Sequence, residues 1–363
     1  MLEVAPPLAA TGKGWKMKTL LNGLAAGLMA AALAALPAAA QNKVKINVGY
    51  VPALASGPLY IAKEKGYYDA LGLDVEVQRI VSSSDMAAML ATNRLQVISG
   101  SLSVGFFNSI EKDLPVKLMM SRNGSPAFHN LLLRTDLKDK VKTPADLKGK
   151  TIAIVARGSI IIYEVAKILE KGGLTLKDVE AKYMPFNQMA IAFENKAIDA
   201  ALMIPPLVDV VVQKGFAVKF IDPEDVIEEK PILITVKQVN MDWAAKNPQA
   251  AKDFVYATLK GAHDYCNAYH GGPNRAEVVK ILAKYSDVDD PAIIEKIDWG
   301  TRDPTGRVFE ASLMDIQKYY HQEGLTAKTY PIERLVQQDW LDEANKRLGP
   351  FKLVHDDGRP GCR

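Results

Sequence analysis

Two runs of alternating strands and helices constrain the fold of this chain more than any other feature. The first run contains apolar segments typical of strands, with helix-like segments between them: "VKINVGY" (44–50), "LDVEVQRI" (73–80), "VISGS" (97–101) and "VKLMMSR" (116–122). The helix-like segments carry apolar residues at three- and four-residue spacing. Strands and helices that alternate at this spacing predict an α/β fold with a parallel or mixed sheet covered on both faces.

A second run of the same kind lies between residues 134 and 232. Its most informative part is "TIAIVARGS" (151–159), a buried strand that passes through a glycine turn into a helix with Ser159 as the expected N-cap. "PILITVKQVN" (231–240) is extended again, and the chain beyond it is mostly helical.

The two runs predict two lobes joined by two crossing strands. The expected crossings are the extended segments near 130–135 and 232–237, and Arg122 and Asn123 flank the first of them. Lobe one would comprise residues 43–131 and 234–363, and lobe two residues 133–232. Two crossing strands between two lobes form a hinge.

The N-terminal segment indicates export. Three lysines between residues 13 and 18 precede an apolar, alanine-rich segment that ends in "AAA" at 38–40. This is the pattern of a cleaved secretory signal peptide, expected over residues 1–40, with Met17 as an alternative start. A membrane anchor is the other interpretation, but the apolar run is short for a membrane span.

Composition and motifs exclude several classes of function. The net charge of the 363 residues is only +3, and no lysine- or arginine-rich tract is present, so nucleic-acid binding is not expected. The sequence contains no G-x-S-x-G, H-E-x-x-H or C-x-x-C motif, and its five histidines are scattered. We therefore expect no catalytic residues, no metal and no cofactor. Cys266 and Cys362 either form a disulfide in the exported protein or remain separate.

Four segments in order carry a resemblance to a known family. They are "INVGYVPALASGPLYIAKEKGYYDALGLDVEV", "ATNRLQVISGSLS", "KTPADLKGKTIAIVARGS" and "IAFENKAIDAALMIPP". Together they resemble the periplasmic substrate-binding proteins of nitrate, sulfonate and taurine ABC importers, a group that includes proteins binding thiamine-precursor pyrimidines. The resemblance implies a two-lobed, type II periplasmic binding protein. Such a protein is a monomer that closes over one small ligand and delivers it to an ABC permease in the inner membrane.

The resemblance leaves two alternatives. One is a protein that binds a thiamine-pyrimidine precursor, or a synthase-like protein of the same superfamily. The synthase branch consumes its own histidine and uses a cysteine-rich iron motif, which two isolated cysteines do not match. The other alternative is a partner of a sensor or chemoreceptor with the same fold.

The expected ligand site follows from the topology. In open α/β sheets, ligands bind beyond the carboxyl ends of the strands, where helix N-termini favour anions. We therefore expect a small organic anion of the carboxylate or sulfonate type. The expected ligand-binding residues are Ser56, Gly57, Ser83, Ser84, Ser101, His129, Arg157, Gly158, Ser159, Asn187, Met203 and Pro205.

Arg157 is the expected clamp for the anion, because a guanidinium binds an oxyanion through two parallel hydrogen bonds. Alternatively, Arg157 points to solvent and Ser159 only caps its helix. The candidates for contact with an apolar part of the ligand are Phe106, Phe107, Phe128 and Phe186.

Overall fold

The computed structural model describes residues 1–2, 4–5, 43–80 and 83–362. Its main compact unit begins at Lys43, and the description below concerns this unit alone. The predicted signal peptide, residues 1–40, lies almost entirely outside the described residues. In the part of the chain that is described, no helix combines the length and apolarity needed to cross a membrane.

The first sheet contains five strands in the order β2-β1-β3-β10-β4. These strands are β1 (Val44–Tyr50), β2 (Leu73–Arg79), β3 (Val97–Ser101), β4 (Val116–Ser121) and β10 (Thr235–Asn240). β1 runs parallel to β2 and β3, while β10 is antiparallel to both β3 and β4. The chain thus leaves this sheet after β4 and returns to its interior more than a hundred residues later.

The second sheet repeats this plan in the order β7-β6-β8-β5-β9. Its strands are β5 (Asn130–Arg134), β6 (Thr151–Ile154), β7 (Glu180–Tyr183), β8 (Ala200–Met203) and β9 (Ala217–Ile221). β5 is antiparallel to its neighbours β8 and β9, and β6 is parallel to β7 and β8. The predicted α/β class with mixed sheets is confirmed. The bounds of the two lobes remain a prediction.

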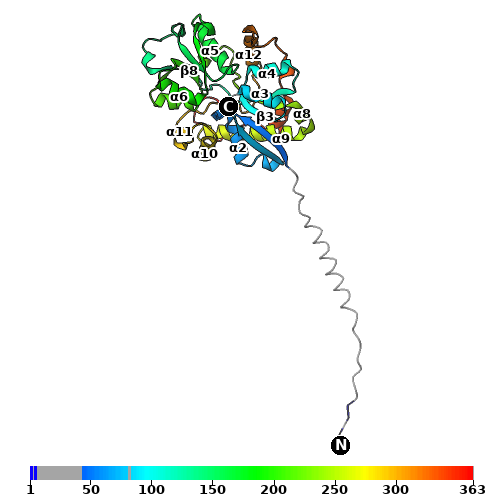
Figure 1. Ribbon diagram of the computed structural model, residues 1–363. Helices are drawn as coiled ribbons and strands as arrows, with labels where there is room; N and C mark the ends of the chain where they lie inside the picture. The colour runs from blue at the N-terminus through cyan, green and yellow to red at the C-terminus, as the bar shows by residue number, and fades with distance from the viewer. Residues whose placement is uncertain (3, 6–42, 81–82, 363) are drawn as a thin grey trace. The chain divides into compact units, whose positions relative to one another are not determined.

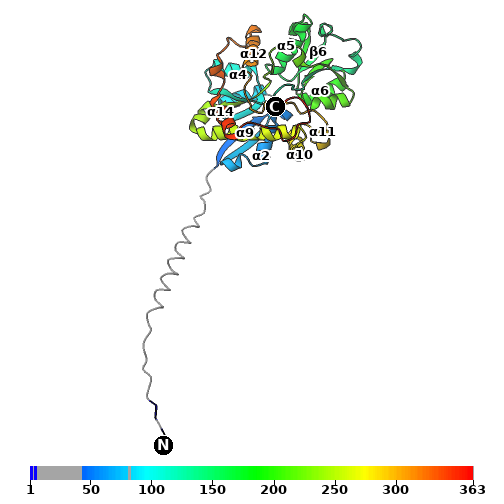
Figure 2. The ribbon, with the colours of Figure 1, turned by 180° about the vertical axis from the view of Figure 1, so that it is seen from behind.

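Helices flank both sheets, as Figures 1 and 2 show from opposite sides. Those that alternate with the strands are α2 (Gly57–Glu64), α3 (Ser83–Ala91), α4 (Val104–Glu111), α5 (Ile160–Lys171), α6 (Phe186–Glu194) and α7 (Leu207–Gln213). The C-terminal part adds α8 (Met241–Lys246), α9 (Pro248–Tyr269), α10 (Arg275–Tyr285), α11 (Pro291–Ile294), α12 (Glu310–Gln322), α13 (Ile332–Leu335) and α14 (Asp339–Leu348). The expected helical C-terminal part is therefore present.

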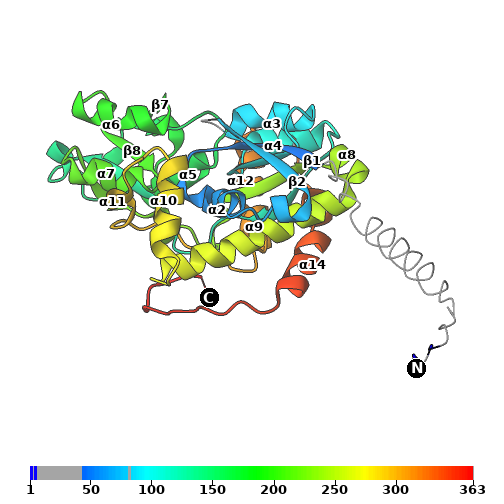
Figure 3. The ribbon, with the colours of Figure 1, turned by 90° about the horizontal axis from the view of Figure 1, so that it is seen from below.

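The long helix α9 organises the face of the first sheet on which α2 lies. Its buried residues join those of β1 and α2 in one hydrophobic cluster, and Figure 3 shows α2 and α14 beside it. The cysteines, whose pairing the sequence left open, form a disulfide between Cys266 of α9 and Cys362, with Cα atoms 5.4 Å apart. The C-terminal segment is thereby tied to the end of α9.

α2 and α9 approach so closely at Gly261 that a side chain there has no room. A Cβ atom on Gly261 would lie 2.3 Å from the backbone oxygen of Pro58 in α2. We expect Gly261→Ala to lower the free energy of unfolding by about 1–3 kcal/mol, because overpacking outweighs alanine's better helix propensity.

Urea denaturation measures this change. The control is Lys280→Ala on an exposed position of α10, which should change stability by no more than about 0.5 kcal/mol. A Gly261→Ala protein as stable as the wild type would show that the two helices do not pack as described.

Candidate functional site

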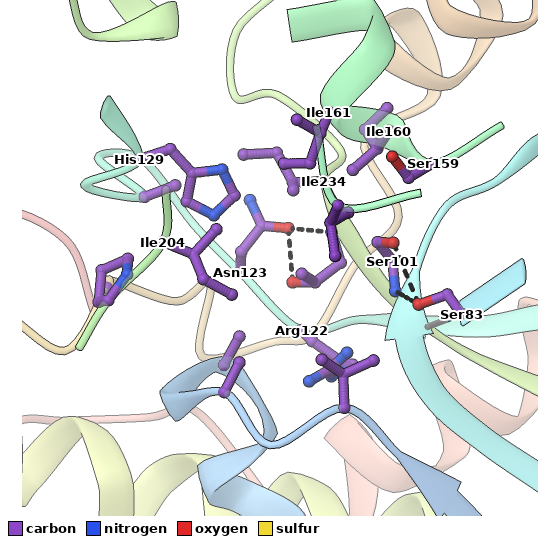
Figure 4. Close-up of a pocket in the computed structure, with 18 of the residues that line it drawn as sticks. Ser83, Ser101, Arg122, Asn123, His129, Ser159, Ile160, Ile161, Ile204 and Ile234 are labelled. Carbon is purple, nitrogen blue, oxygen red and sulfur yellow. Dashed lines mark hydrogen bonds between the residues drawn. The ribbon is translucent and has the colours of Figure 1, made fainter. Parts of the chain in front are cut away.

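A cavity lies where the carboxyl ends of strands from both sheets meet (Figure 4). It encloses about 780 Å³ of space, including its opening to solvent. Loops or helix starts that follow strands β1, β3, β4, β6 and β8 contribute to its lining, together with the irregular segment Trp299–Arg302. This is the position at which α/β sheets bind ligands.

Most of the cavity wall is apolar. Four isoleucines contribute to it: Ile160 and Ile161 at the start of α5, Ile204 directly after β8 and Ile234 directly before β10. Two aromatic side chains, Phe186 and Trp299, add larger surfaces. Of the four phenylalanines considered from the sequence, Phe186 lines the cavity, whereas Phe106 and Phe107 are buried in the core. A wall of this kind suits the apolar part of an organic molecule.

Arg122, directly after β4, is the first of two buried arginines at this cavity. Its side chain lies inside the protein, with the residue only 4% exposed. Nη1 donates a hydrogen bond to the backbone oxygen of Gly100 at 2.5 Å, and Nη2 donates to the hydroxyl of Ser56. Among the described residues, none supplies an acceptor for its Nε–H group. The acceptors that they supply to this guanidinium are thus neutral oxygens.

Arg302 is the second buried arginine, and it is 3% exposed. Its guanidinium donates to the backbone oxygens of Arg122 and Leu54, the latter at 3.0 Å. Its Nε–H finds no acceptor in the part of the chain that the structure describes. The guanidinium carbon also lies 3.9 Å from the centre of the Tyr265 ring. Within the described part of the chain, no carboxylate forms an ion pair with either arginine.

These charges disfavour one another. Burial lowers the pKa of Arg122 to about 9; the Tyr60 hydroxyl opposes this shift, and the neighbouring Arg302 charge adds to it. Lys237 lies in the same region, where its Nζ donates to the Ser99 hydroxyl at 3.0 Å. Burial holds the pKa of Lys237 well below its ordinary value, and the charges of the two arginines act in the same direction. Buried charges are normally paired, whereas the described residues place no carboxylate in an ion pair with these arginines.

His129 lies on the opposite side of the cavity from Ser83 and Ser101 (Figure 4). Its Nδ1 is 3.0 Å from the carboxylate of Glu164, a fully buried residue of α5. Burial disfavours the charged ring. The acidic groups around it nevertheless raise the pKa of His129, with Glu164 acting most strongly, followed by Asp222 and Glu224.

Five of the residues predicted from the sequence line the cavity: Ser83, Ser101, His129, Ser159 and Pro205. The backbone N–H and hydroxyl of Ser101 lie 2.7 and 3.1 Å from the Ser83 hydroxyl. The Ser159 hydroxyl donates to the backbone oxygen of Ala156 at 2.9 Å. Ser159 is the N-cap residue of α5 by position, but its side chain accepts no capping hydrogen bond.

The other predicted residues lie outside this lining. Ser56 is buried, and its hydroxyl accepts a hydrogen bond from Arg122. Gly57 starts α2 against Tyr265, and Met203 is fully buried in the core. Asn187 lines a smaller neighbouring pocket. The side chain of Ser84 lies outside the description.

Arg157, the predicted clamp, and the adjacent Gly158 also lie outside the cavity lining. Gly158 accepts a hydrogen bond from the N–H of Val104 through its backbone oxygen, at 2.9 Å. Arg157 is exposed, and its guanidinium lies 4.3 Å from the centre of the Tyr183 ring. The arginines in the cavity lining are therefore Arg122 and Arg302, and Arg157 is not among the lining residues. Arg122 follows a strand end, as the predicted serines do, whereas no sequence pattern points to Arg302.

Comparison with protein families matches residues 54–269, more than half of the chain, to the family described as NMT1/THI5 like. Riboflavin-binding protein RibY of Chloroflexus aurantiacus is 28% identical over 230 residues, which cover 61% of this chain. The match spans 62% of RibY's own length. The nitrate/nitrite binding protein NrtA of Synechocystis is 23% identical over 337 residues, which cover 85% of this chain and 67% of NrtA.

Solved structures share the fold. The NrtA crystal structure has a TM-score of 0.68 at 18% identity, with 84% of this chain and 89% of that chain covered. The alkanesulfonate-binding protein SsuA from Xanthomonas axonopodis pv. citri, bound to MOPS, has a TM-score of 0.66 at 16% identity, with 82% and 99% covered. The chain belongs to the NMT1/THI5-like family and has the α/β fold of type II periplasmic binding proteins.

Proposed function

We propose that this protein is the solute-binding component of an ABC import system. In this proposal it is exported to the periplasm and works as a monomer of two lobes, residues 43–131 with 234–363 and residues 133–232. It captures a small organic anion of the carboxylate or sulfonate type and delivers it to a permease in the inner membrane. The family and the fold support the carrier class, and NrtA and SsuA are carriers of anions by name.

The observation that carries the anion proposal is the pair of buried arginines. Arg122 and Arg302 both line the cavity. Among the described residues, neither has a carboxylate partner and neither has an acceptor for its Nε–H. An anionic group at this end of the cavity would supply the missing charge and accept charge-assisted hydrogen bonds. The same group would gain from the low dielectric of a buried site.

The apolar wall favours an organic anion over an inorganic one. A nitrate ion would leave the isoleucines, Phe186 and Trp299 in contact with water, whereas an organic body buries their surface. Each square ångström of apolar surface removed from water contributes about 25 cal/mol. We infer that the head of the ligand binds near the arginines and that its body lies against this wall.

Contacts between the two proposed lobes support ligand capture by closure. The Val104 N–H donates to Gly158, and the Tyr163 hydroxyl of α5 donates to Asp315 of α12 at 2.5 Å. The His129–Glu164 pair lies next to the first crossing. In our proposal a ligand that contacts both lobes shifts the population toward the closed state.

The synthase-like alternative requires thiolates that this chain does not offer. The sequence has two cysteines, and both are joined in the disulfide between α9 and the C-terminal segment. We therefore favour binding over catalysis. A neutral pyrimidine or riboflavin as ligand remains the outcome that competes with an anion.

Ligand class is testable by thermal denaturation with matched pairs of compounds. We expect benzenesulfonate and benzoate to raise the melting temperature, because a bound ligand stabilises the folded state by mass action, by about 2.7 kcal/mol at a hundredfold excess over Kd. The uncharged analogues benzenesulfonamide and benzamide should have little effect. Stabilisation by riboflavin or an aminopyrimidine, with none by any anion, would overturn the anion proposal, and turnover of a compound would overturn the binding role.

The roles of the arginines are testable by titration calorimetry with benzenesulfonate. Arg122→Met and Arg302→Met should each weaken binding at least tenfold, about 1.4 kcal/mol, since each removes a buried charge that contacts the anion. The matched control is Arg94→Met, an exposed arginine after α3, which should bind like the wild type. Arg157→Ala tests the clamp expected from the sequence. If Arg157→Ala loses affinity for benzenesulfonate while Arg122→Met retains it, Arg157 binds the anion as the sequence predicted.

The His129–Glu164 pair predicts a pH dependence of stability. The pKa of His129 is raised in the folded protein. Its contribution to stability is therefore complete below the unfolded pKa of about 6.5, and it is lost as the pH rises through the folded pKa. The difference in unfolding free energy between the wild type and His129→Gln should shrink as the pH rises from about 6 to about 9.

Urea denaturation across this pH range measures the difference. Glu164→Gln removes the charge that raises the histidine pKa and should lose the same pH dependence. Parallel curves for the wild type and His129→Gln would show that the ring does not titrate with a raised pKa.

A further inference from the structure

The segment that carries Arg302 has no helix or strand to hold its shape. Residues 298–303 have irregular backbone, although Thr301 and Arg302 are both buried. Their backbone groups are bound on one side by the loop after β4. The Thr301 N–H and hydroxyl donate to the backbone oxygen of Pro126 at 3.1 and 2.8 Å, and the Gly124 N–H donates to the oxygen of Thr301 at 2.8 Å. The position of Arg302 thus depends on tertiary contacts.

The C-terminal strap, which we define as residues 357–362, binds the same segment from the other side. The Cys362 N–H donates to the backbone oxygen of Arg302 at 3.0 Å. Gly361 packs so tightly on Thr301 that a Cβ atom on it would lie 2.3 Å from the Thr301 Cβ. The strap therefore contacts both buried residues of the segment.

α9 and the residue directly after it, His270, hold the strap at three points. Cys266 forms the disulfide with Cys362. The ring of His270, itself fully buried, bonds the strap through both nitrogens: Nε2 donates to the backbone oxygen of Gly361 at 3.0 Å, and Nδ1 lies 2.9 Å from a carboxylate oxygen of Asp357. Between these points the strap is mostly exposed and irregular, and Figure 3 shows the chain after α14 running back alongside α9.

We propose that the C-terminal strap is a positioning element of the ligand site. It holds the backbone of Thr301 and Arg302 against the loop after β4, so that the Arg302 guanidinium stays at the cavity in the ligand-free protein. Such preorganisation raises affinity because less freedom is lost on binding. The inference about affinity rests on the proposed function, whereas the inference about local order does not.

Two glycines of the strap provide a matched pair for the test. Gly358 and Gly361 have φ values of +81° and +80°, so alanine strains the backbone equally at both positions. A Cβ atom at Gly358 meets nothing within 4 Å, whereas one at Gly361 collides with Thr301. Gly361→Ala therefore disturbs the contact with the segment, and Gly358→Ala is its control. Cys266→Ser with Cys362→Ser removes the main anchor.

Two measurements are made on each full-length variant. The first is amide hydrogen exchange of the ligand-free protein over residues 122–127 and 299–303, and the second is the Kd for benzenesulfonate. We expect Gly361→Ala and the double cysteine variant to exchange at least tenfold faster in these two stretches and to bind at least tenfold more weakly, about 1.4 kcal/mol. Gly358→Ala should match the wild type in both measurements.

Several results would overturn the proposal. Unchanged exchange in the double cysteine variant would show that the strap does not order the segment. Faster exchange throughout α9 and both sheets would show a general loss of stability in place of positioning. Faster amide exchange in the two stretches without any change in the Kd for benzenesulfonate would show that the strap does not contribute to binding. A further outcome is that the wild type fails to bind benzenesulfonate while the Gly361→Ala and double cysteine variants still exchange faster in the two stretches. In that case the anion proposal fails and the ordering role of the strap stands.

Discussion

The hydrogen bond from the Arg302 guanidinium to the backbone oxygen of Arg122 joins two parts of the chain that are 180 residues apart in sequence. One part is the end of a strand, which the first sheet holds in place. The other part is irregular and follows the helical C-terminal region. Because a buried guanidinium needs acceptors for its N–H groups, the loops around the cavity arrange their carbonyl oxygens about these two side chains. In the proposed function, an anionic ligand balances the charge of this pair.

The strand order explains why the candidate site lies where it does. Each sheet contains one strand that runs antiparallel to its neighbours and directly follows a crossing between the two sheets. This strand is β10 in the first sheet and β5 in the second. The remaining strands direct their carboxyl ends toward the same cavity. Backbone N–H groups, serine hydroxyls and the arginines therefore converge on one space, although they come from segments spread over 250 residues.

Some residues predicted for the site could be placed from strand topology, whereas the position of others depends on tertiary contacts. Ser83, Ser101 and Ser159 follow strand ends, so topology alone brings them to the cavity lining. Arg157 also follows a strand end, but its side chain leaves the turn toward the Tyr183 ring. A strand end specifies where the backbone goes, and the direction of a long, flexible side chain depends on its tertiary neighbours. The prediction is therefore better for short side chains than for arginine.

From the sequence by itself one can derive the alternation of strands and helices, the α/β class, the family and the edge of the sheets at which the cavity lies. These follow from local periodicity and from the geometry of parallel strands. The tertiary structure alone decided the disulfide, the strap that it anchors and the identity of the charged pair, Arg122 and Arg302. Each of these depends on which distant segments meet, and burial then leaves the two guanidiniums beside one cavity without a carboxylate partner in the described chain.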